Sequence, residues 1–141
     1  MEIKTRDFGT IELNAEDIIH FAEPIFGFED YKDFIILFDD EIGDDFAWLQ
    51  SCEDENTCFV IASAAGLKFE YNPAIPASTL AAVGGDYELW LIMNVAEDMA
   101  KSTVNLKSPI VSCTHTATAA QTISEDKLPI KYALFEGKEL C

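Results

Sequence analysis

Two five-residue runs of this sequence, residues 34–38 and 89–93, are apolar at every position. Successive side chains of a β-strand point to opposite faces of its sheet, so such a strand must be covered on both sides. Gly, Pro and Asn residues divide the rest of the chain into short segments typical of strands and turns. We therefore predict a mainly β fold: one compact barrel-like or sandwich domain over residues 1–141, with one or two short helices.

The expected strands have β-like composition and alternation. They are residues 2–6, 10–13, 34–38, 46–51, 57–63, 88–95, 110–115, 118–123 and 130–135. The best helix candidate is residues 77–83, because Gly84 follows where a left-handed residue often ends a helix. Residues 14–21 stay open, since Asn14 favours a helix N-cap whereas residues 17–21 also fit a strand.

The charge balance of the chain is strongly acidic. It carries 26 acidic and 9 basic residues, a net charge of −17, and the first 57 residues hold 17 of the acids. Nucleic-acid-binding proteins need cationic surfaces, and anionic membranes attract basic proteins, so we expect neither as a direct partner. A basic protein partner is favoured because opposite potentials steer association, and self-repulsion favours a monomer.

The cellular compartment is predicted from the N-terminus and the cysteines. Residues 1–7 mix acids and bases, unlike a signal peptide, and no apolar run approaches the length of a membrane span. Cys52, Cys58, Cys113 and Cys141 show no CxxC spacing. We therefore expect a cytoplasmic protein with free thiols.

Catalytic and metal-binding patterns are sparse. Cys113 and His115 would share one face of a strand over residues 110–115. Two ligands are too few for a closed zinc site, and a Cys–His dyad needs an orienting third group. The sequence therefore predicts no enzyme activity, no metal and no cofactor, with both side chains structural.

The densest group of acids lies at residues 39–45, and its members are Asp39, Asp40, Glu41, Asp44 and Asp45. Its spacing does not fit a calcium loop, because Gly43 comes one position early. Two readings remain: a solvated hairpin loop, or a docking patch for a basic partner.

Aromatic residues form two groups. Phe46 and Trp48 alternate with Gln50 on one face of a predicted strand, which indicates core positions or an apolar anchor ringed by acids. Gly27 stands between two phenylalanines, one of them Phe28, and this predicts a sharp turn with positive φ.

Several strings keep their order from about residue 3 to residue 134. They are residues 18–21, 25–29 with Gly27 and Phe28, 46–51 with Trp48 and Gln50, 59–61, 70–71, and 103–111 with Asn105 and Pro109, followed by Gln121. This ordered set resembles the FliW family of flagellar assembly factors over nearly the whole chain.

The resemblance implies a non-enzymatic cytoplasmic regulator with a compact β-barrel-like fold. A FliW-like protein is expected to bind flagellin and, once freed, to bind the carbon storage regulator CsrA. CsrA represses translation of flagellin mRNA, so its capture lifts the repression. The family pattern implies allosteric antagonism, whereas charge alone leaves competition with RNA open.

We predict a partner-binding surface in two parts. The first is Glu70, Tyr71 and Asn72, in the loop after the strand at residues 57–63, where exposed polar and aromatic groups can meet a partner. The second, giving electrostatic support, is Asp39, Asp40, Asp44 and Asp45. Alternatively, the ring of Tyr71 lies flat over the end of the barrel.

Asn105 and Pro109 are assigned to backbone geometry, because Asn can bond its own turn and Pro cannot donate to a central strand ladder. Two other functions stay open. One is an acidic nucleic-acid mimic that inhibits another basic protein. The other is a metal- or thiol-dependent enzyme that uses Cys113 and His115.

Overall fold

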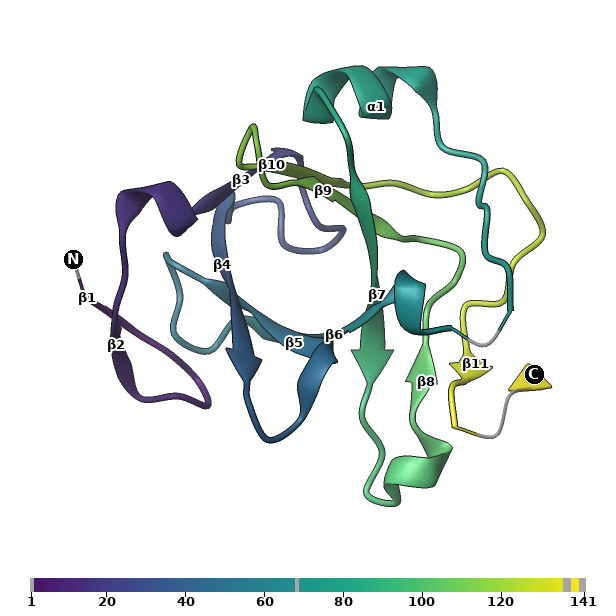
Figure 1. The fold of residues 1–141 in the computed structure, drawn as a ribbon, viewed down its shortest axis with the longest axis horizontal. Helices are drawn as coiled ribbons and strands as arrows, with labels where there is room; N and C mark the ends of the chain where they lie inside the picture. The colour runs from purple at the N-terminus through teal and green to yellow at the C-terminus, as the bar shows by residue number, and fades with distance from the viewer. Residues whose placement is uncertain (1, 68, 136–137, 140–141) are drawn as a thin grey trace.

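Seven strands close into a barrel in the computed structural model, which describes residues 2–67, 69–135 and 138–139 (Figure 1). In order around the wall they are β3 (Ile19–Glu23), β4 (Asp33–Asp39), β5 (Gly43–Ser51), β6 (Cys58–Ser63), β7 (Glu88–Asn94), β9 (Ile110–Cys113) and β10 (Thr118–Gln121). Neighbouring strands are antiparallel except β10 and β3, whose parallel pairing closes the ring. The predicted mainly β, barrel-like fold is confirmed.

The remaining elements lie outside this wall. They are the hairpin of β1 (Glu2–Lys4) and β2 (Thr10–Glu12), the short strands β8 (Thr103–Val104), β11 (Tyr132–Ala133) and β12 (Lys138–Glu139), the 3₁₀ turns η1 (Ala15–Asp17), η2 (Ala64–Gly66) and η3 (Met99–Lys101), and the helix α1 (Ala77–Val83). Strands β8, β11 and β12 extend the sheet from the far end of β7. Within the described residues, no helix has the length and hydrophobicity that crossing a membrane requires.

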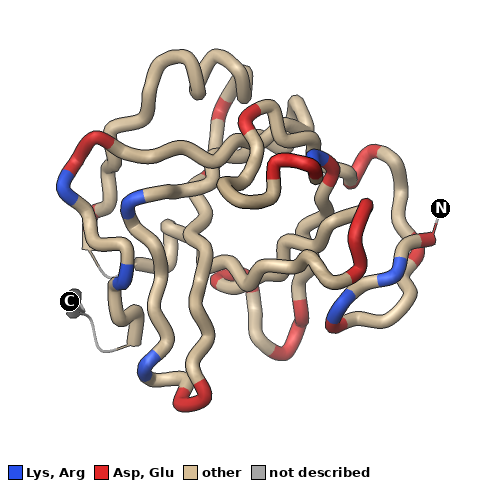
Figure 2. Tube along the Cα trace, turned by 180° about the vertical axis from the view of Figure 1, so that it is seen from behind, with Lys and Arg blue, Asp and Glu red and all other residues tan. Residues whose placement is uncertain are grey.

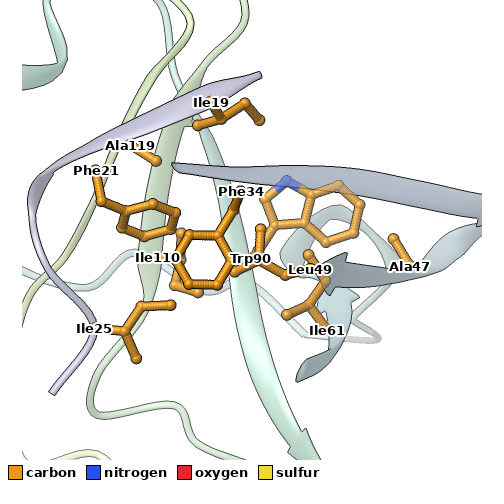
Figure 3. Close-up of a cluster of buried hydrophobic side chains, with 10 residues drawn as sticks. All are labelled: Ile19, Phe21, Ile25, Phe34, Ala47, Leu49, Ile61, Trp90, Ile110 and Ala119. Carbon is orange, nitrogen blue, oxygen red and sulfur yellow. The ribbon is translucent and has the colours of Figure 1, made fainter. Parts of the chain in front are cut away.

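Inward-facing side chains of the wall strands fill the barrel. Together with Ile25, which follows β3, they form one buried cluster, which Figure 3 shows: Ile19, Phe21, Ile25, Phe34, Ala47, Leu49, Ile61, Trp90, Ile110 and Ala119. The rings of Phe21 and Phe34 meet edge to face, with centroids 5.1 Å apart. Residues two apart on a strand share a face, so the alternation within each strand selects this set.

The apolar run on β7 is covered on two sides, as predicted, whereas the run on β4 is covered only in part, because Phe38 near its end is 48% exposed. On β7, Trp90 faces the barrel, whereas Leu91 and Met93 pack outward against Val104 and Leu106. On β4, Phe34 is inside the barrel and the next residue, Ile35, is also buried. The outer cover of β7 comes from the segment that carries β8 and β11.

The helix α1 has the predicted boundaries. Its C-cap residue Gly84 adopts a left-handed conformation with φ of 76°, and the Gly84 N–H donates to the carbonyl of Leu80 at 3.0 Å. The helix covers the outer face of β9 and β10, where Val83 packs with Val111 and Ala120. A glycine after an apolar run was therefore a sufficient signal for the helix end.

Several predicted strands are shorter in the structure. The strand predicted at residues 110–115 ends at Cys113, because a turn with Ala117 at φ of 52° follows it. The strand at 118–123 ends at Gln121, and the one at 130–135 is reduced to β11. Residues 14–21 divide into η1 and the beginning of β3, so each of the two open readings holds for part of this segment.

Of the two readings for Phe46 and Trp48, the core reading holds only in part: neither side chain enters the barrel, but Phe46 packs against the outer buried cluster beside β7. The inward side chains of β5 are Ala47 and Leu49, and the two aromatic rings lie half-buried on the outer face. Trp48 packs edge to face against Phe8, which follows β1, with ring centroids 5.1 Å apart. Both faces of this strand are apolar, so alternation alone did not tell the inner from the outer one.

Candidate functional site

The acidic group at residues 39–45 forms the tip of the β4–β5 hairpin. Oδ1 of Asp39 accepts from the Glu41 N–H at 2.9 Å, and Gly43 turns the chain with φ of 94°. Asp40, Glu41, Asp44 and Asp45 are exposed, whereas Asp39 is half-buried. Asp39 therefore shapes the turn, and the other carboxylates face solvent.

The second predicted group, Glu70 to Asn72, follows η2. The hydroxyl of Tyr71 donates to the carbonyl of Leu106 at 2.5 Å, and its half-buried ring packs against the outer cluster beside β7. This burial raises the pKa of Tyr71 well above its usual range. Nδ2 of Asn72 donates to Oε1 of Glu70 at 2.8 Å, and both side chains are exposed. Tyr71 thus anchors the loop and leaves its neighbours to solvent.

The two predicted groups meet at one hollow of about 700 Å³, which we call the hairpin groove. Its lining residues come from the β4–β5 hairpin, η2, the following loop and the beginning of β7: Phe38, Asp44, Ser63, Ala64, Ala65, Tyr71, Asn72, Tyr87, Glu88, Leu89 and Trp90. The structure therefore brings Asp44, Tyr71 and Asn72 together. Asp39, Asp40, Asp45 and Glu70 are not among the lining residues.

Aromatic side chains of the groove were missed by the sequence analysis. Phe38 is 48% exposed and Tyr87 is 44% exposed, and the ring of Phe38 lies 6.2 Å from that of the buried Trp90. Phe38 is the last residue of an apolar run and directly precedes the acids, which is the signal that could have identified it. A groove whose lining combines exposed aromatic rings with carboxylates is typical of a protein-binding surface.

A smaller hollow of about 240 Å³ lies on the other side of the hairpin. Asp45 and Phe46 line it together with the exposed rings of Phe69 and Phe135. Asp45 also packs beside Gly66, where an added Cβ would lie 3.1 Å from the carboxylate. Asp44 and Asp45, which are neighbours on β5, therefore line two different hollows, and both hollows carry exposed aromatic rings.

Charge is unevenly distributed over the molecule. Acidic residues mark the N-terminal half of the chain, and most lysines lie on the side formed by the C-terminal half (Figure 2). The hairpin groove lies where the acidic β4–β5 hairpin meets β7. A basic partner approaching this face meets a favourable potential, because surface charges of one sign add over such distances.

The residues assigned to backbone geometry hold turns together. Oδ1 of Asn105 accepts from the N–H groups of Lys107 and Ser108 at 2.9 and 3.0 Å, as expected for an Asn that bonds its own turn. Pro109 is buried and immediately precedes β9, outside the strand ladder. Gly27 has the predicted positive φ, at 87°.

Two further residues of the structural group are tied into the core. Phe28 is half-buried with its ring 5.0 Å from that of Phe59. Gln50 is fully buried, and its Oε1 accepts from the Arg6 N–H at 3.0 Å. The amide nitrogen of Gln50 lies 3.1–3.4 Å from four carbonyls, those of Ser51, Asp54, Glu55 and Thr57.

The Cys113 and His115 pair does not form a site. Cys113 is buried at the end of β9, whereas His115 is exposed in the following turn, so the predicted shared strand face is wrong. Hydrogen bonding by Thr116 lowers the pKa of the Cys113 thiol. Cys52 and Cys58 are also free thiols, and Cys141 lies outside the described residues. In the part of the chain that the structure describes, no three His, Cys, Asp or Glu side chains are grouped to hold a metal ion.

Comparison with known proteins gives consistent results for sequence and fold. The family model described as FliW protein matches residues 2–134. The flagellar assembly factor FliW of Caldicellulosiruptor bescii is 34% identical over 140 residues, covering 96% of this chain and 91% of the relative. That of Lachnoclostridium phytofermentans is 35% identical over 143 residues, covering 96% and 92%. A crystal structure of the flagellar assembly factor FliW superposes with a TM-score of 0.88 at 28% identity, covering 96% of this chain and 97% of that one.

Proposed function

This chain belongs to the FliW family, and from that premise we infer that it is a cytoplasmic, non-enzymatic regulator that binds flagellin and, when free of flagellin, binds and antagonises CsrA. Release of CsrA-mediated repression then allows flagellin mRNA to be translated. The single observation that carries the proposal beyond the family is the hairpin groove. It is large, lies on an acidic face and presents exposed aromatic rings.

The chemistry of the groove suits a protein ligand. Phe38 and Tyr87 offer apolar contact area, and Asp44 and Glu88 add two carboxylates to the lining. Binding energy at protein interfaces is concentrated in such aromatic centres, and charged edges act mainly on association rate and partner choice. An RNA-binding repressor presents basic surface, so a net charge of −17 favours its approach.

One shared surface is enough to explain alternation between two partners. If flagellin and CsrA both contact the hairpin groove, binding of one excludes the other, and free concentration and affinity determine which is bound. We place the contact at the groove residues Asp44, Tyr71 and Asn72, with Asp39, Asp40, Asp45 and Glu70 supplying charge around it. The protein acts as a monomer in this scheme.

Calorimetric titration with purified flagellin and CsrA tests the proposal. Asp44→Asn and Tyr87→Ala should weaken the binding of CsrA and flagellin by at least about tenfold each if the groove carries the contact. Matched controls are Asp30→Asn and Phe26→Ala, whose exposed side chains lie between β3 and β4, at the opposite end of β4 from the hairpin. Absence of binding to both partners at micromolar protein would contradict the proposal.

A second titration tests exclusive binding. Protein saturated with flagellin should no longer bind CsrA, whereas formation of a ternary complex would contradict a shared surface. A gel shift with labelled RNA then distinguishes the nucleic-acid-mimic alternative. A mimic would compete with RNA for the RNA-binding surface of the target protein. An allosteric antagonist would instead lower the maximum RNA occupancy at saturating RNA.

A further inference from the structure

The smaller hollow beside Asp45 has a lining that the proposed function does not use. We call it the aromatic hollow and define it by four aromatic side chains and one carboxylate: Phe46 and Asp45 of β5, Phe69 of the loop after η2, Tyr132 of β11, and Phe135 just after β11. Its volume of about 240 Å³ is below the range of about 300–1,000 Å³ typical of pockets for drug-sized ligands. The hollow therefore suits the end of one side chain or a small cation.

The aromatic rings of the hollow are arranged in two pairs. The ring centroids of Phe46 and Phe135 lie 6.1 Å apart, and those of Phe69 and Tyr132 lie 5.3 Å apart, edge to face. Each pair has one member open to solvent, since Phe69 is 39% exposed and Phe135 is 46% exposed. The π-system of an aromatic ring is negative on its face, so a group of open rings attracts cations.

The charge of the hollow points to the same kind of occupant. Asp45 is exposed, and it is the only charged residue among the described residues of the lining. Its Oδ1 lies 3.1 Å from where a Cβ would stand on Gly66, which also lines the hollow, so the carboxylate is at the wall. Aromatic rings and a carboxylate, without a lysine or arginine in this described lining, are complementary to a cation.

We propose that the aromatic hollow binds a quaternary ammonium group. The methyl groups of the ligand contact the rings of Phe69 and Phe135, and Asp45 supplies the opposite charge. The same head group occurs on a trimethylated lysine of a protein and on small molecules such as choline. This site goes beyond the proposed function and does not depend on it, because its rings are not part of the hairpin groove.

The lining favours a methylated cation over the ordinary ones. A lysine head group carries three N–H donors and an arginine head group five, and each donor loses hydrogen bonds to water on entering an aromatic lining. A trimethylated ammonium has the charge without the donors. An uncharged apolar group would leave the Asp45 carboxylate without a counter-charge, so it fits less well than the cation.

The test compares ligands that differ in one property at a time. The capped peptide Gly-Gly-Lys-Gly-Gly, with its lysine trimethylated or unmodified, holds charge constant, so attraction to a protein of net charge −17 is the same for both. Choline and its neutral carbon analogue 3,3-dimethylbutan-1-ol hold shape constant. The readout is the amide resonance of Gly66 in ¹⁵N-labelled protein, because Gly66 lines the hollow.

The trimethylated peptide should shift this resonance saturably, with a dissociation constant below about 10 mM, and should bind at least about fivefold more tightly than the unmodified peptide. Choline should exceed its neutral analogue by at least about fivefold. Tighter binding of the trimethylated peptide than of choline assigns the site to a protein side chain, and the reverse order assigns it to a free small molecule.

Variants assign the contact to the aromatic hollow. Asp45→Asn and Phe69→Leu should each weaken the trimethylated peptide by at least about threefold. Glu41→Gln is the matched control for Asp45→Asn, because it removes one exposed charge from the same hairpin at a residue outside the lining. Phe26→Leu is the control for Phe69→Leu, because it shortens an exposed ring between β3 and β4. Both controls should bind like the parent protein.

Four results would each overturn the proposal: no saturable shift of Gly66, equal binding of the two peptides, equal binding of choline and its neutral analogue, or equal effects of Asp45→Asn and Glu41→Gln. Unchanged amide spectra away from the hollow show that the variants are folded. Normal binding of flagellin and CsrA alongside any of these four results would leave the proposed function standing.

Discussion

Replacing Gln50 with methionine should destabilise the fold. The side chain is fully buried and links three segments, since Oε1 accepts from Arg6 and Nε2 donates to carbonyls of the β5–β6 turn. Methionine has a similar length and can occupy the same space. The substitution therefore tests the hydrogen bonds rather than the packing.

The expected magnitude comes from the number of bonds lost. Nε2 has two protons to share among its four carbonyl neighbours, and Oε1 contributes a third bond, so about three bonds at about 1 kcal/mol each give about 3 kcal/mol. The carbonyls of Asp54 and Thr57 retain second donors, the N–H groups of Thr57 and Ser51, at 3.1 and 2.9 Å. Because the Asp54 and Thr57 carbonyls each keep one hydrogen bond after the substitution, their contribution to the loss of stability is small. A loss of about 3 kcal/mol is a large part of a typical stability of about 5–15 kcal/mol.

Urea unfolding followed by circular dichroism measures this loss as a lower midpoint at unchanged slope. Gln121→Met is the matched control, because Gln121 is also buried but makes two such bonds, from the Phe26 N–H at 2.8 Å and to the Ser108 carbonyl at 3.3 Å. It should cost about 2 kcal/mol. The reasoning fails if Gln50→Met costs less than Gln121→Met, or less than about 1 kcal/mol.

Three other changes test separate features. Asn105→Ala removes the acceptor for two backbone N–H groups and should lower the free energy of unfolding by about 1 kcal/mol, whereas Asn105→Asp should restore most of it in the same urea titration. Gly27→Ala meets no atom within 4 Å, so its cost in that assay should be backbone strain alone, about 1 kcal/mol; a neutral result would contradict the left-handed turn. Burial raises the pKa of Cys52 to about 11, so iodoacetamide should alkylate it at pH 8 about 100-fold more slowly than an exposed thiol. Because the folded state keeps this proton to higher pH than the unfolded chain, the free energy of unfolding should fall between pH 9 and 11, and Cys52→Ser should reduce that fall.

The features that could be predicted from sequence depend on local chemistry. A run that is apolar at every position favours cover on both faces, and this correctly indicated a closed wall around β7 and the buried beginning of β4. The end of α1 depends on Gly84 alone, because a left-handed residue without a Cβ is available there. The turn at Asn105 likewise depends on one side chain and the N–H groups two and three residues after it.

The choice of inner face on β5 could not be predicted in the same way. Trp48 lies outside because the β1–β2 segment brings Phe8 over it, and nothing near residue 48 specifies that distant contact. The smaller Ala47 is inside because the barrel is already filled by larger side chains such as Phe34. The inward side chains of all the strands together fill the interior of a closed barrel, so the size of side chain that fits at one position cannot be derived from its own strand.

The candidate site was predicted in pieces. Asp44 and Tyr71 were each proposed from local composition, and the hairpin groove that unites them depends on how η2 and β7 lie against the β4–β5 hairpin. Phe38 and Trp90 were treated as ordinary strand residues. Their place together in the lining of the hairpin groove depends on how β4 and β7 lie relative to one another, which cannot be derived from either segment alone.

The parallel pairing of β3 with β10 joins segments nearly one hundred residues apart in the chain. During synthesis the first six wall strands therefore emerge with an unsatisfied edge, and the ring cannot shut until residues 118–121 have left the ribosome. Folding of contacts this distant is slow, and exposed edges invite aggregation in the meantime. Like charges repel, so the concentration of negative charge in the first 57 residues of the sequence disfavours association between such unfinished chains.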